Sequence, residues 1–253
     1  MRKFGVIGAN GFVGSNLMNS AYSTIPVTRE NISDIAGLGC DHFVVSAVSA
    51  TKWKANSDPK KDRDEIATLL SNLHPESGYS LTLISTIDVF PKNYSFTETT
   101  PVEFMEKEEE YGKNRAWLEC ELGDKFEDLT IVRLPGLFGP GLKKNLIFDL
   151  LHNKPIARLN PDSHFQFYDI RNLAKDLSLL WEGNLKIQNM ATQPISVAEI
   201  LSLFNRPELS VLDEPPFHYR MKTVNGGLFG PGRNDYIEDS ESVLREIKNW
   251  IGN

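Results

Sequence analysis

The sequence predicts an α/β protein built on a doubly wound parallel sheet, with a small C-terminal lobe. Short apolar runs alternate with helix-length amphipathic stretches, which is the pattern of strand–helix–strand units. The first of these runs ends in a glycine-rich turn that leads into a helical stretch. From residue 141 onward prolines, glycines and aromatic residues become more frequent, above all between Arg206 and Arg233. We therefore expect a sheet domain at residues 1–140 and a loop-rich substrate-binding lobe at 141–253, with 170–192 returning to the sheet.

The apolar runs indicate five strands, and the amphipathic stretches indicate five helices. The expected strands are Phe4–Ile7, Ile25–Thr28, His42–Ala47, Ser80–Ser85 and Leu129–Leu134. The expected helices are Phe12–Tyr22, Lys60–His74, Glu106–Lys125, Asn172–Trp181 and Glu241–Ile251. Pro59 suits the first turn of the second helix, where a backbone N–H would have no helical partner. In that helix Ile66, Leu69, Leu70 and Leu73 form one apolar stripe.

Composition and charge narrow the classes of function. The 253 residues are enough for a full core, and 40% hydrophobic with 24% charged residues are typical of a globular protein. A formal net charge of −7 argues against nucleic acid or an anionic membrane as the main partner. The two cysteines and five histidines show no disulfide or metal-ligand spacing, so we expect no metal. We also expect a cytoplasmic protein, because the first apolar run is too short for a signal peptide or a membrane span.

The glycine-rich turn is the first candidate site. Gly8, Gly11 and Gly14 follow directly after the first strand. Without side chains, the turn lets backbone N–H groups and the positive end of the next helix face a pyrophosphate. A tight turn that only permits close packing is the alternative. The place of the turn, directly behind a buried strand, favours a dinucleotide site. Three neighbours belong to the same expected site: Asn10, Phe12 and Val13.

The second candidate site combines two hydroxyls with a tyrosine–arginine pair. Ser85 and Thr86 end a buried strand, and ligands of open parallel sheets bind at such carboxyl ends. Tyr111 and Arg115 are four residues apart on an expected helix and therefore share one face. A cation within about 5 Å of a phenol contributes roughly 3 kcal/mol at a dielectric of ~20, which would lower the phenol pKa by about two units. Such a phenol can exchange a proton with a carbinol oxygen while a nicotinamide carries hydride.

Each of these features also has a structural explanation when it is taken singly. Tyr111 is explained equally well as a helix-surface aromatic beside a cation. The two hydroxyls are explained as a strand end that caps the following turn. Their occurrence together, behind the glycine turn, favours a catalytic site.

Further segments carry a resemblance that runs along nearly the whole chain. Besides the GxxGxxG turn they are 85–90 (STIDVF), 97–101 (TETTP), 133–140 (RLPGLFGP), 166–174 (QFYDIRNLA) and 232–240 (GRNDYIEDS). In type and order these segments resemble the extended short-chain dehydrogenase/reductase family of nucleotide-sugar epimerases, dehydratases and ketoreductases. The resemblance implies a Rossmann fold, an NAD(P) cofactor and a nucleotide-sugar substrate. It also implies a homodimer formed through the helices at 60–74 and 106–125.

The resemblance implies a role for each residue that matches a family motif. Thr86 would hydrogen-bond the substrate oxygen, and Tyr111 would be the acid/base with Arg115 beside it. Arg233 would hold the substrate diphosphate, a task that suits a guanidinium group. The remaining matches are Ser85 and Asp88 on the substrate side and Pro135 on the cofactor side, where Tyr111 and Arg115 also contribute.

Two positions and one stretch depart from the family pattern. Arg115 stands in place of a lysine, and arginine keeps the positive charge but cannot release a proton to a relay. Ile87 replaces an acidic residue of the dehydratases, which favours reduction or epimerisation of a keto group. The stretch between Thr28 and Cys40 is short, so we expect an abbreviated third strand around Ile32. Because of Arg115, a non-catalytic NADP(H)-binding sensor is the alternative to an enzyme.

The choice of cofactor depends on the end of the second strand. NAD sites place an acidic residue there, which holds the ribose 2′-hydroxyl. Thr28 and Arg29 occupy this place, and a hydroxyl with a guanidinium suits a 2′-phosphate. Glu30 follows directly and weakens this preference. The sequence therefore favours NADP, with NAD possible.

Overall fold

The computed structural model describes residues 3–102, 109–156, 159–205 and 215–252, and the chain divides into two compact units. The first unit comprises Met1–Pro91, Pro101–Arg133 and Arg171–Gln188. The second comprises Lys92–Thr100, Leu134–Ile170 and Asn189–Asn253. Each unit therefore contains segments that are far apart in the sequence.

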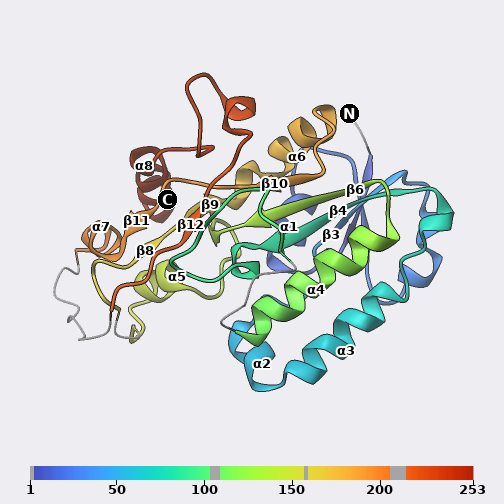
Figure 1. Ribbon diagram of the computed structural model, residues 1–253, viewed down its shortest axis with the longest axis horizontal. Helices are drawn as coiled ribbons and strands as arrows, with labels where there is room; N and C mark the ends of the chain where they lie inside the picture. Colours follow the sequence, from blue (N-terminus) through green and yellow to red (C-terminus); the bar gives the residue numbers. More distant parts are fainter. Residues whose placement is uncertain (1–2, 103–108, 157–158, 206–214, 253) are drawn as a thin grey trace. The chain divides into compact units, whose positions relative to one another are not determined.

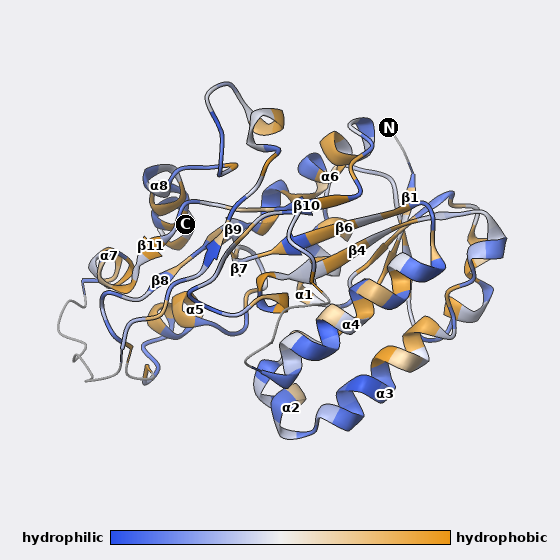
Figure 2. Ribbon diagram, viewed as in Figure 1, coloured by the Kyte–Doolittle hydropathy of each residue, from blue (hydrophilic) through white to orange (hydrophobic). Residues whose placement is uncertain are grey.

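A six-stranded sheet forms the centre of the first unit (Figure 1). Its strands, in spatial order, are β10 (Ile187–Asn189), β6 (Leu129–Leu134), β4 (Ser80–Thr86), β3 (His42–Val45), β1 (Phe4–Ile7) and β2 (Thr24–Val27). The pairs β1–β2, β1–β3 and β3–β4 are parallel. All residues of β1 and β3 are buried, as expected of strands covered on both faces, and the sheet is mainly orange in Figure 2. The predicted doubly wound α/β fold is confirmed.

Helices cover both faces of this sheet. On one face α3 (Pro59–Leu70) and α4 (Glu110–Lys125) lie side by side, and they pack on Phe43, Leu81 and Leu83. On the other face Trp181 of α6 (Leu173–Glu182) contacts the rings of Phe4 and His42. Alternate residues of a strand point to opposite faces, so the side chains of the neighbouring residues His42 and Phe43 pack on opposite faces of the sheet. The first β-to-α turn leads into the short helix α1 (Phe12–Met18).

The apolar stripe of α3 lies inside this core. Ile66 is 1% exposed and Leu73, just beyond the helix, is 0% exposed. Asp58 caps the helix by accepting a hydrogen bond from the Lys61 N–H, with Pro59 in the first turn as expected. Packing within the monomer therefore accounts for the apolar stripe of α3, and this stripe does not support a dimer.

The connection from β2 to β3 differs from the prediction. Ile32–Leu38 form a 3-10 helix (η1), and residues 28–41 contain no strand. The expected abbreviated strand around Ile32 is therefore wrong. A crossover between parallel strands itself takes about a dozen residues, and residues 28–41 provide little more than that. As a result β2 stays at the edge of the sheet.

Other element bounds differ from the expected ones by a few residues. Helix α1 ends at Met18 rather than Tyr22, and the expected first residues of the Glu106–Lys125 helix lie partly outside the described residues. A short helix, α2 (Lys52–Ser57), precedes α3 and was not predicted, because six residues are too few for a helical period to be read. The described residues contain four further 3-10 turns: η2 (Pro75–Ser77), η3 (Ile87–Val89), η4 (Ile170–Asn172) and η5 (Gly226–Phe229).

The second unit consists of short strand pairs and helices around a smaller core. The strand pairs are β7 (Gly136–Phe138) with β9 (Phe167–Asp169), β8 (His164–Phe165) with β11 (Ile195–Ser196), and β5 (Ser95–Phe96) with β12 (Arg220–Met221). The helices are α5 (Leu146–Leu151), α7 (Val197–Leu203) and α8 (Ser240–Ile251). Phe138, Phe167, Ile200 and Ile247 are central residues of its core.

Glu98 connects three segments of the second unit. Its Oε1 accepts hydrogen bonds from the Asn189 N–H at 2.9 Å and the Thr223 hydroxyl at 2.6 Å. Its Oε2 accepts one from the Val224 N–H at 2.9 Å. The acidic residue of the 97–101 segment is therefore a structural link.

Candidate functional site

The three glycines after β1 differ in what a side chain at each position would contact. Gly8 has φ +88°, and a Cβ there would lie 2.6 Å from the Ala47 Cα. A Cβ on Gly14 would collide with the Gly8 carbonyl oxygen. The packing of α1 against the end of β1 therefore requires glycine at positions 8 and 14. At Gly11 the nearest atom to an added Cβ is the Gly8 oxygen at 3.3 Å, a tight contact without overlap, so packing restricts this position less than the other two.

A cleft of about 630 Å³ opens beside this turn. Five of the residues predicted to bind a cofactor line it together: Gly8, Asn10, Gly11, Thr28 and Arg29. Its opposite wall is formed by α3, including Asp62 and Glu65, and by Ser49 after β3. Phe12, Val13 and Gly14 follow in α1 and do not line the cleft. Open backbone at a strand end beside a cleft of this size fits a dinucleotide, with Gly11 admitting a pyrophosphate.

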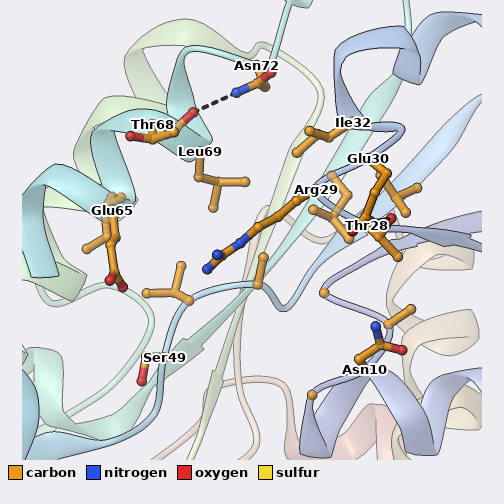
Figure 3. Close-up of a pocket in the computed structure, with 18 of the residues that line it drawn as sticks. Asn10, Thr28, Arg29, Glu30, Ile32, Ser49, Glu65, Thr68, Leu69 and Asn72 are labelled. Atoms are coloured by element: carbon orange, nitrogen blue, oxygen red, sulfur yellow. Dashed lines mark hydrogen bonds between the residues drawn. The ribbon is translucent and has the colours of Figure 1, made fainter.

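The end of β2 brings a cation and an anion to the cleft. Figure 3 shows Arg29 extending across it, with its guanidinium pointing toward the side where Glu65 and Ser49 lie. The Thr28 hydroxyl donates a hydrogen bond to the Glu30 carboxylate, and this bond lowers the pKa of Glu30. Arg29 fits a 2′-phosphate, whereas the ionised Glu30 fits a free 2′-hydroxyl. The site therefore fits NADP or NAD.

Tyr111 lies in the first turn of α4 and is buried, with 6% of its surface exposed. Its backbone N–H donates to Asn56 Oδ1 at 2.9 Å, which ties this turn to α2. The Arg115 guanidinium carbon is 4.3 Å from the centre of the Tyr111 ring. Thr86, at the end of β4, and Arg115 both lie close enough to the phenol to favour its charged form. The structure thus brings together the three residues predicted to be catalytic.

The pKa of Tyr111 differs from the prediction. Burial raises it to about 12, and Asp88 adds to the rise, although Arg115 and Thr86 act in the opposite direction. The expected net lowering is therefore wrong, because burial of the phenol outweighs the attraction of the guanidinium. At neutral pH Tyr111 is a protonated phenol.

Arg115 has a partner that the sequence did not reveal. Its Nη1 and Nη2 donate to the two carboxylate oxygens of Asp62 on α3, at 2.7 and 3.0 Å. Nη2 also donates to the Ser49 carbonyl oxygen. Both side chains of the pair are buried, at 5% and 7% exposure. Burial raises the pKa of Asp62, but the hydrogen bonds from Arg115 and Asn114 outweigh it and leave this pKa lowered.

This pair connects the tyrosine to the cleft. Ser49 and Asp62 both line the cleft, and both hold the guanidinium that contacts Tyr111. Neither residue was predicted from the sequence. Asp62 is only one of several charged residues in the α3 segment, so its inward direction was not apparent before the packing of α3 on α4 was known.

Ser85 and Asp88 occupy different surroundings. The Ser85 hydroxyl donates to Glu119 Oε1 in the core, where Glu119 also pairs with Arg133. Its substrate-side role stays a prediction. Asp88 lies in the 3-10 turn η3 (Ile87–Val89), accepts a hydrogen bond from the Thr86 hydroxyl at 3.0 Å and pairs with Lys52 at 2.6 Å.

Two of the predicted residues belong to the second unit. Pro135 is buried in the segment between β6 and β7. Arg233 is exposed in the loop before α8, and its guanidinium donates to the Ile237 carbonyl oxygen. Their roles toward cofactor and substrate stay predictions.

No family model and no curated protein matches this sequence. Solved structures do match. A dTDP-4-dehydrorhamnose reductase from Bacillus anthracis in complex with NADP is 15% identical, with 99% of this chain and 98% of that chain covered and a TM-score of 0.75. The chain has the Rossmann-type fold of this reductase.

Two further structures extend the comparison to other activities. A dTDP-glucose 4,6-dehydratase from Streptomyces venezuelae with NAD bound is 16% identical, with coverage of 99% and 97% and a TM-score of 0.72. An L-threonine dehydrogenase from Phytophthora infestans is also 16% identical, with coverage of 98% of each chain and a TM-score of 0.73. The fold is thus shared by proteins whose names give different substrates.

The described residues include no group of three or more histidine, cysteine, aspartate or glutamate side chains placed to hold a metal ion. Within the same residues, no helix has both the length and the apolar character required to cross a membrane.

Proposed function

We propose that the protein is an NAD(P)-dependent oxidoreductase of the extended short-chain type, which reduces or epimerises a keto group on a nucleotide-linked sugar. One observation carries the proposal. The Arg115 guanidinium lies against the ring of Tyr111, Thr86 lies near the phenol, and Arg115 is held by two residues of the glycine-lined cleft. An acid and a cofactor cleft are thus parts of one site.

Within the proposed function, the state of Tyr111 favours reduction. A bound reduced nicotinamide supplies hydride to a carbonyl carbon. Thr86 hydrogen-bonds the carbonyl oxygen, and the protonated Tyr111 gives its proton to that oxygen. Epimerisation begins with removal of a proton from an alcohol, which requires the phenolate. A pKa of about 12 disfavours this form at neutral pH.

The sugar nucleotide as substrate is supported by the sequence motifs and by two of the structural neighbours. The reductase and the dehydratase carry dTDP-linked sugars in their names, whereas the L-threonine dehydrogenase does not. The exposed Arg233 suits a diphosphate, because a guanidinium binds such oxygens in pairs. Arg29 in the wall of the cleft favours NADP as the cofactor over NAD, the alternative.

The test uses hydride transfer and cofactor binding as separate measurements. NADPH and NADH oxidation is followed at 340 nm with a panel of nucleotide-linked 4-ketosugars, for the wild type and for Tyr111→Phe. Tyr111→Phe should lower kcat by about 10²–10⁴-fold and leave the cofactor Kd unchanged, because the phenol acts in the transition state. Full activity in this variant would show that Tyr111 is not the acid.

A non-catalytic NADP(H)-binding sensor is the second candidate. It is favoured by the Asp62–Arg115 pair, in which the positive charge next to Tyr111 is neutralised by a buried carboxylate. This function requires cofactor binding without turnover of any ketosugar. Gly11→Val separates cofactor binding from other effects, because the branched side chain would enter the cleft where the backbone is open. Binding that survives this change would refute the cleft as the cofactor site for both candidates.

A further inference from the structure

The cleft beside the glycine turn has one end that adjoins Tyr111. Asp62 lines the cleft from α3, and Ser49 lines it after β3. Both residues accept hydrogen bonds from the guanidinium of Arg115, whose carbon is 4.3 Å from the centre of the Tyr111 ring. Asp62 therefore belongs to the end of the cleft that adjoins the proposed acid.

The carboxylate of Asp62 has one acceptor position left. An ionised carboxylate offers about four lone-pair positions, shared equally by its oxygens. Oδ2 accepts from Arg115 Nη1 at 2.7 Å and from Asn114 Nδ2 at 2.8 Å. Oδ1 accepts from Arg115 Nη2 at 3.0 Å, and no other described residue donates to it. Because Asp62 lines the cleft and is otherwise buried, at 7% exposure, a donor that fills the remaining position comes from the cleft.

A dinucleotide brings hydroxyl donors to this end of the cleft. It carries one ribose on each side of its pyrophosphate, and a carboxylate that accepts from a ribose hydroxyl is typical of such sites. In the proposed function the glycine turn receives the pyrophosphate, and Thr28 and Arg29 face the adenosine ribose at the end of β2. The other ribose carries the nicotinamide and lies on the side of Tyr111, because hydride has to be delivered beside the acid.

We propose that Asp62 binds the nicotinamide ribose, with Oδ1 accepting a hydrogen bond from one of its hydroxyls. The inference rests on the proposed function, which places a nicotinamide dinucleotide in the cleft. It differs from what the family resemblance implies, namely that Arg115 contacts the cofactor. Here Arg115 directs both terminal nitrogens at Asp62 and one of them also at the Ser49 carbonyl. Arg115 is then a positioning residue that holds the carboxylate, and the carboxylate binds the ribose.

The charges at this end of the cleft suit a hydroxyl rather than a phosphate. Asp62 and Arg115 form a buried pair whose charges cancel. A hydroxyl donates to the open position of Oδ1, whereas a phosphate oxygen would meet a second anionic oxygen there. Asp62 thus selects the sugar and places the phosphates elsewhere in the cleft.

The test measures the binding of ligands that contain no nicotinamide, so it is independent of hydride transfer. For NADP the ligands are 2′-phospho-ADP-ribose, which has the second ribose, and 2′-phospho-ADP, which lacks it. For NAD they are ADP-ribose and ADP. Calorimetry gives a Kd for each ligand, and the ratio of the Kd values measures the contribution of the second ribose. Asp62→Asn should reduce this contribution by about tenfold or more, because a hydrogen bond to a charged group is lost.

Asparagine removes the acceptor at the required atom. Two donors meet at Oδ2, so the amide oxygen takes that place and the amide NH2 replaces Oδ1. Asp62→Leu with Arg115→Met removes the whole pair without leaving a buried charge, and it should lose the ribose contribution in the same way. Glu65→Gln is the matched control, because Glu65 lines the same cleft from the same helix and its variant should equal the wild type. An unchanged ribose contribution in either Asp62 variant, or an equal loss in Glu65→Gln, would overturn the proposal.

A ligand without the contacted hydroxyl separates direct binding from a structural role of Asp62. The ligands are analogues of the ADP-ribose compound that lack the 2- or the 3-hydroxyl of the second ribose. One of them should bind the wild type about tenfold more weakly than its parent, and Asp62→Asn should bind this analogue and its parent equally. A structural role predicts the same weakening in both proteins, and that result would also overturn the proposal.

The ketosugar assay distinguishes this inference from the proposed function. If the wild type turns over no ketosugar while Asp62→Asn loses the ribose contribution, the inference stands and the catalytic part of the proposed function fails. If the wild type is active and Asp62→Asn keeps the ribose contribution, the inference fails and the proposed function stands.

Discussion

Replacing Arg115 by lysine distinguishes the geometry of this protein from the pattern of the family it resembles. The family pattern has lysine at this position, so the resemblance alone predicts that Arg115→Lys is tolerated or even faster. The structure predicts a loss of stability instead. Two nitrogens of Arg115 bind both oxygens of the Asp62 carboxylate, and one of them also binds the Ser49 carbonyl. The single nitrogen of lysine cannot make all three hydrogen bonds from the same position.

The magnitude follows from the hydrogen bonds that lysine would fail to make. A hydrogen bond to a charged group contributes about 1.5–3 kcal/mol, so the absence of one or two should lower the free energy of unfolding by about 2–4 kcal/mol. Arg115→Met leaves the Asp62 carboxylate buried without its cation and should cost about 3–5 kcal/mol. Both values are large fractions of the stability of a typical domain, which is about 5–15 kcal/mol.

Urea unfolding followed by circular dichroism measures these differences. The double variant Asp62→Leu with Arg115→Met should cost less than the sum of its single changes, with a coupling of about 1–3 kcal/mol. Lys113→Met is the control on the same helix, because Lys113 pairs with Glu110 at the surface and should contribute less than about 1 kcal/mol. The reasoning is refuted if Arg115→Lys unfolds within about 0.5 kcal/mol of the wild type and the coupling is close to zero.

Three further predictions concern the cofactor, pH and assembly. Arg29→Ala should weaken NADPH binding by roughly ten- to a hundredfold and NADH binding far less, as measured by calorimetry. Equal effects on the two cofactors would show that Arg29 does not contact the 2′-phosphate. Burial and the neighbouring Glu246 raise the pKa of Glu238 to about 7, so the stability that its protonated form contributes is lost as pH rises through about 7. Urea titrations from pH 5 to 8 should therefore show that Glu238→Gln gains stability relative to the wild type as pH rises, and a constant difference would contradict this. Light scattering should give twice the 28.5 kDa of one chain if α3 and α4 form the predicted homodimer, and a monomer mass at micromolar concentration would exclude it.

The sheet and the first turn could be predicted because local patterns determine them. Apolar runs bounded by turn residues placed the five expected strands to within two residues at each end, and the i, i+4 spacing placed Tyr111 and Arg115 on one face of α4. The additional strand expected around Ile32 was wrong because chain length, rather than composition, decides whether residues 28–41 can add a strand. Such a decision depends on how far a crossover has to reach.

The partners of the predicted residues could not be read in the same way. Asp62 and Arg115 are 53 residues apart, and only the packing of α3 against α4 brings them together. The direction of Ser85 depends on the pleat of β4, which turns its hydroxyl to Glu119. Burial of Tyr111 reverses the direction of its pKa shift, and it depends on contacts of α4 with other elements such as α2. Residue types were enough to predict an acid/base site, whereas contacts between elements determine the pKa of its tyrosine and the partners of its side chains.

The hydrogen bonds of Glu98 have a consequence for synthesis on the ribosome. Glu98 bonds to Thr223 and Val224, which are 125 and 126 residues further along the chain, and β5 pairs with β12 over a similar separation. The first unit has all its segments once residue 188 has emerged, but residues 92–100 wait for their partners until residue 224. During this interval Glu98 lacks its hydrogen bonds from Thr223 and Val224, and β5 lacks its partner strand. Such exposed strands associate readily with other chains. A nascent chain that stalls before residue 220 would therefore carry a complete sheet unit together with an aggregation-prone second unit.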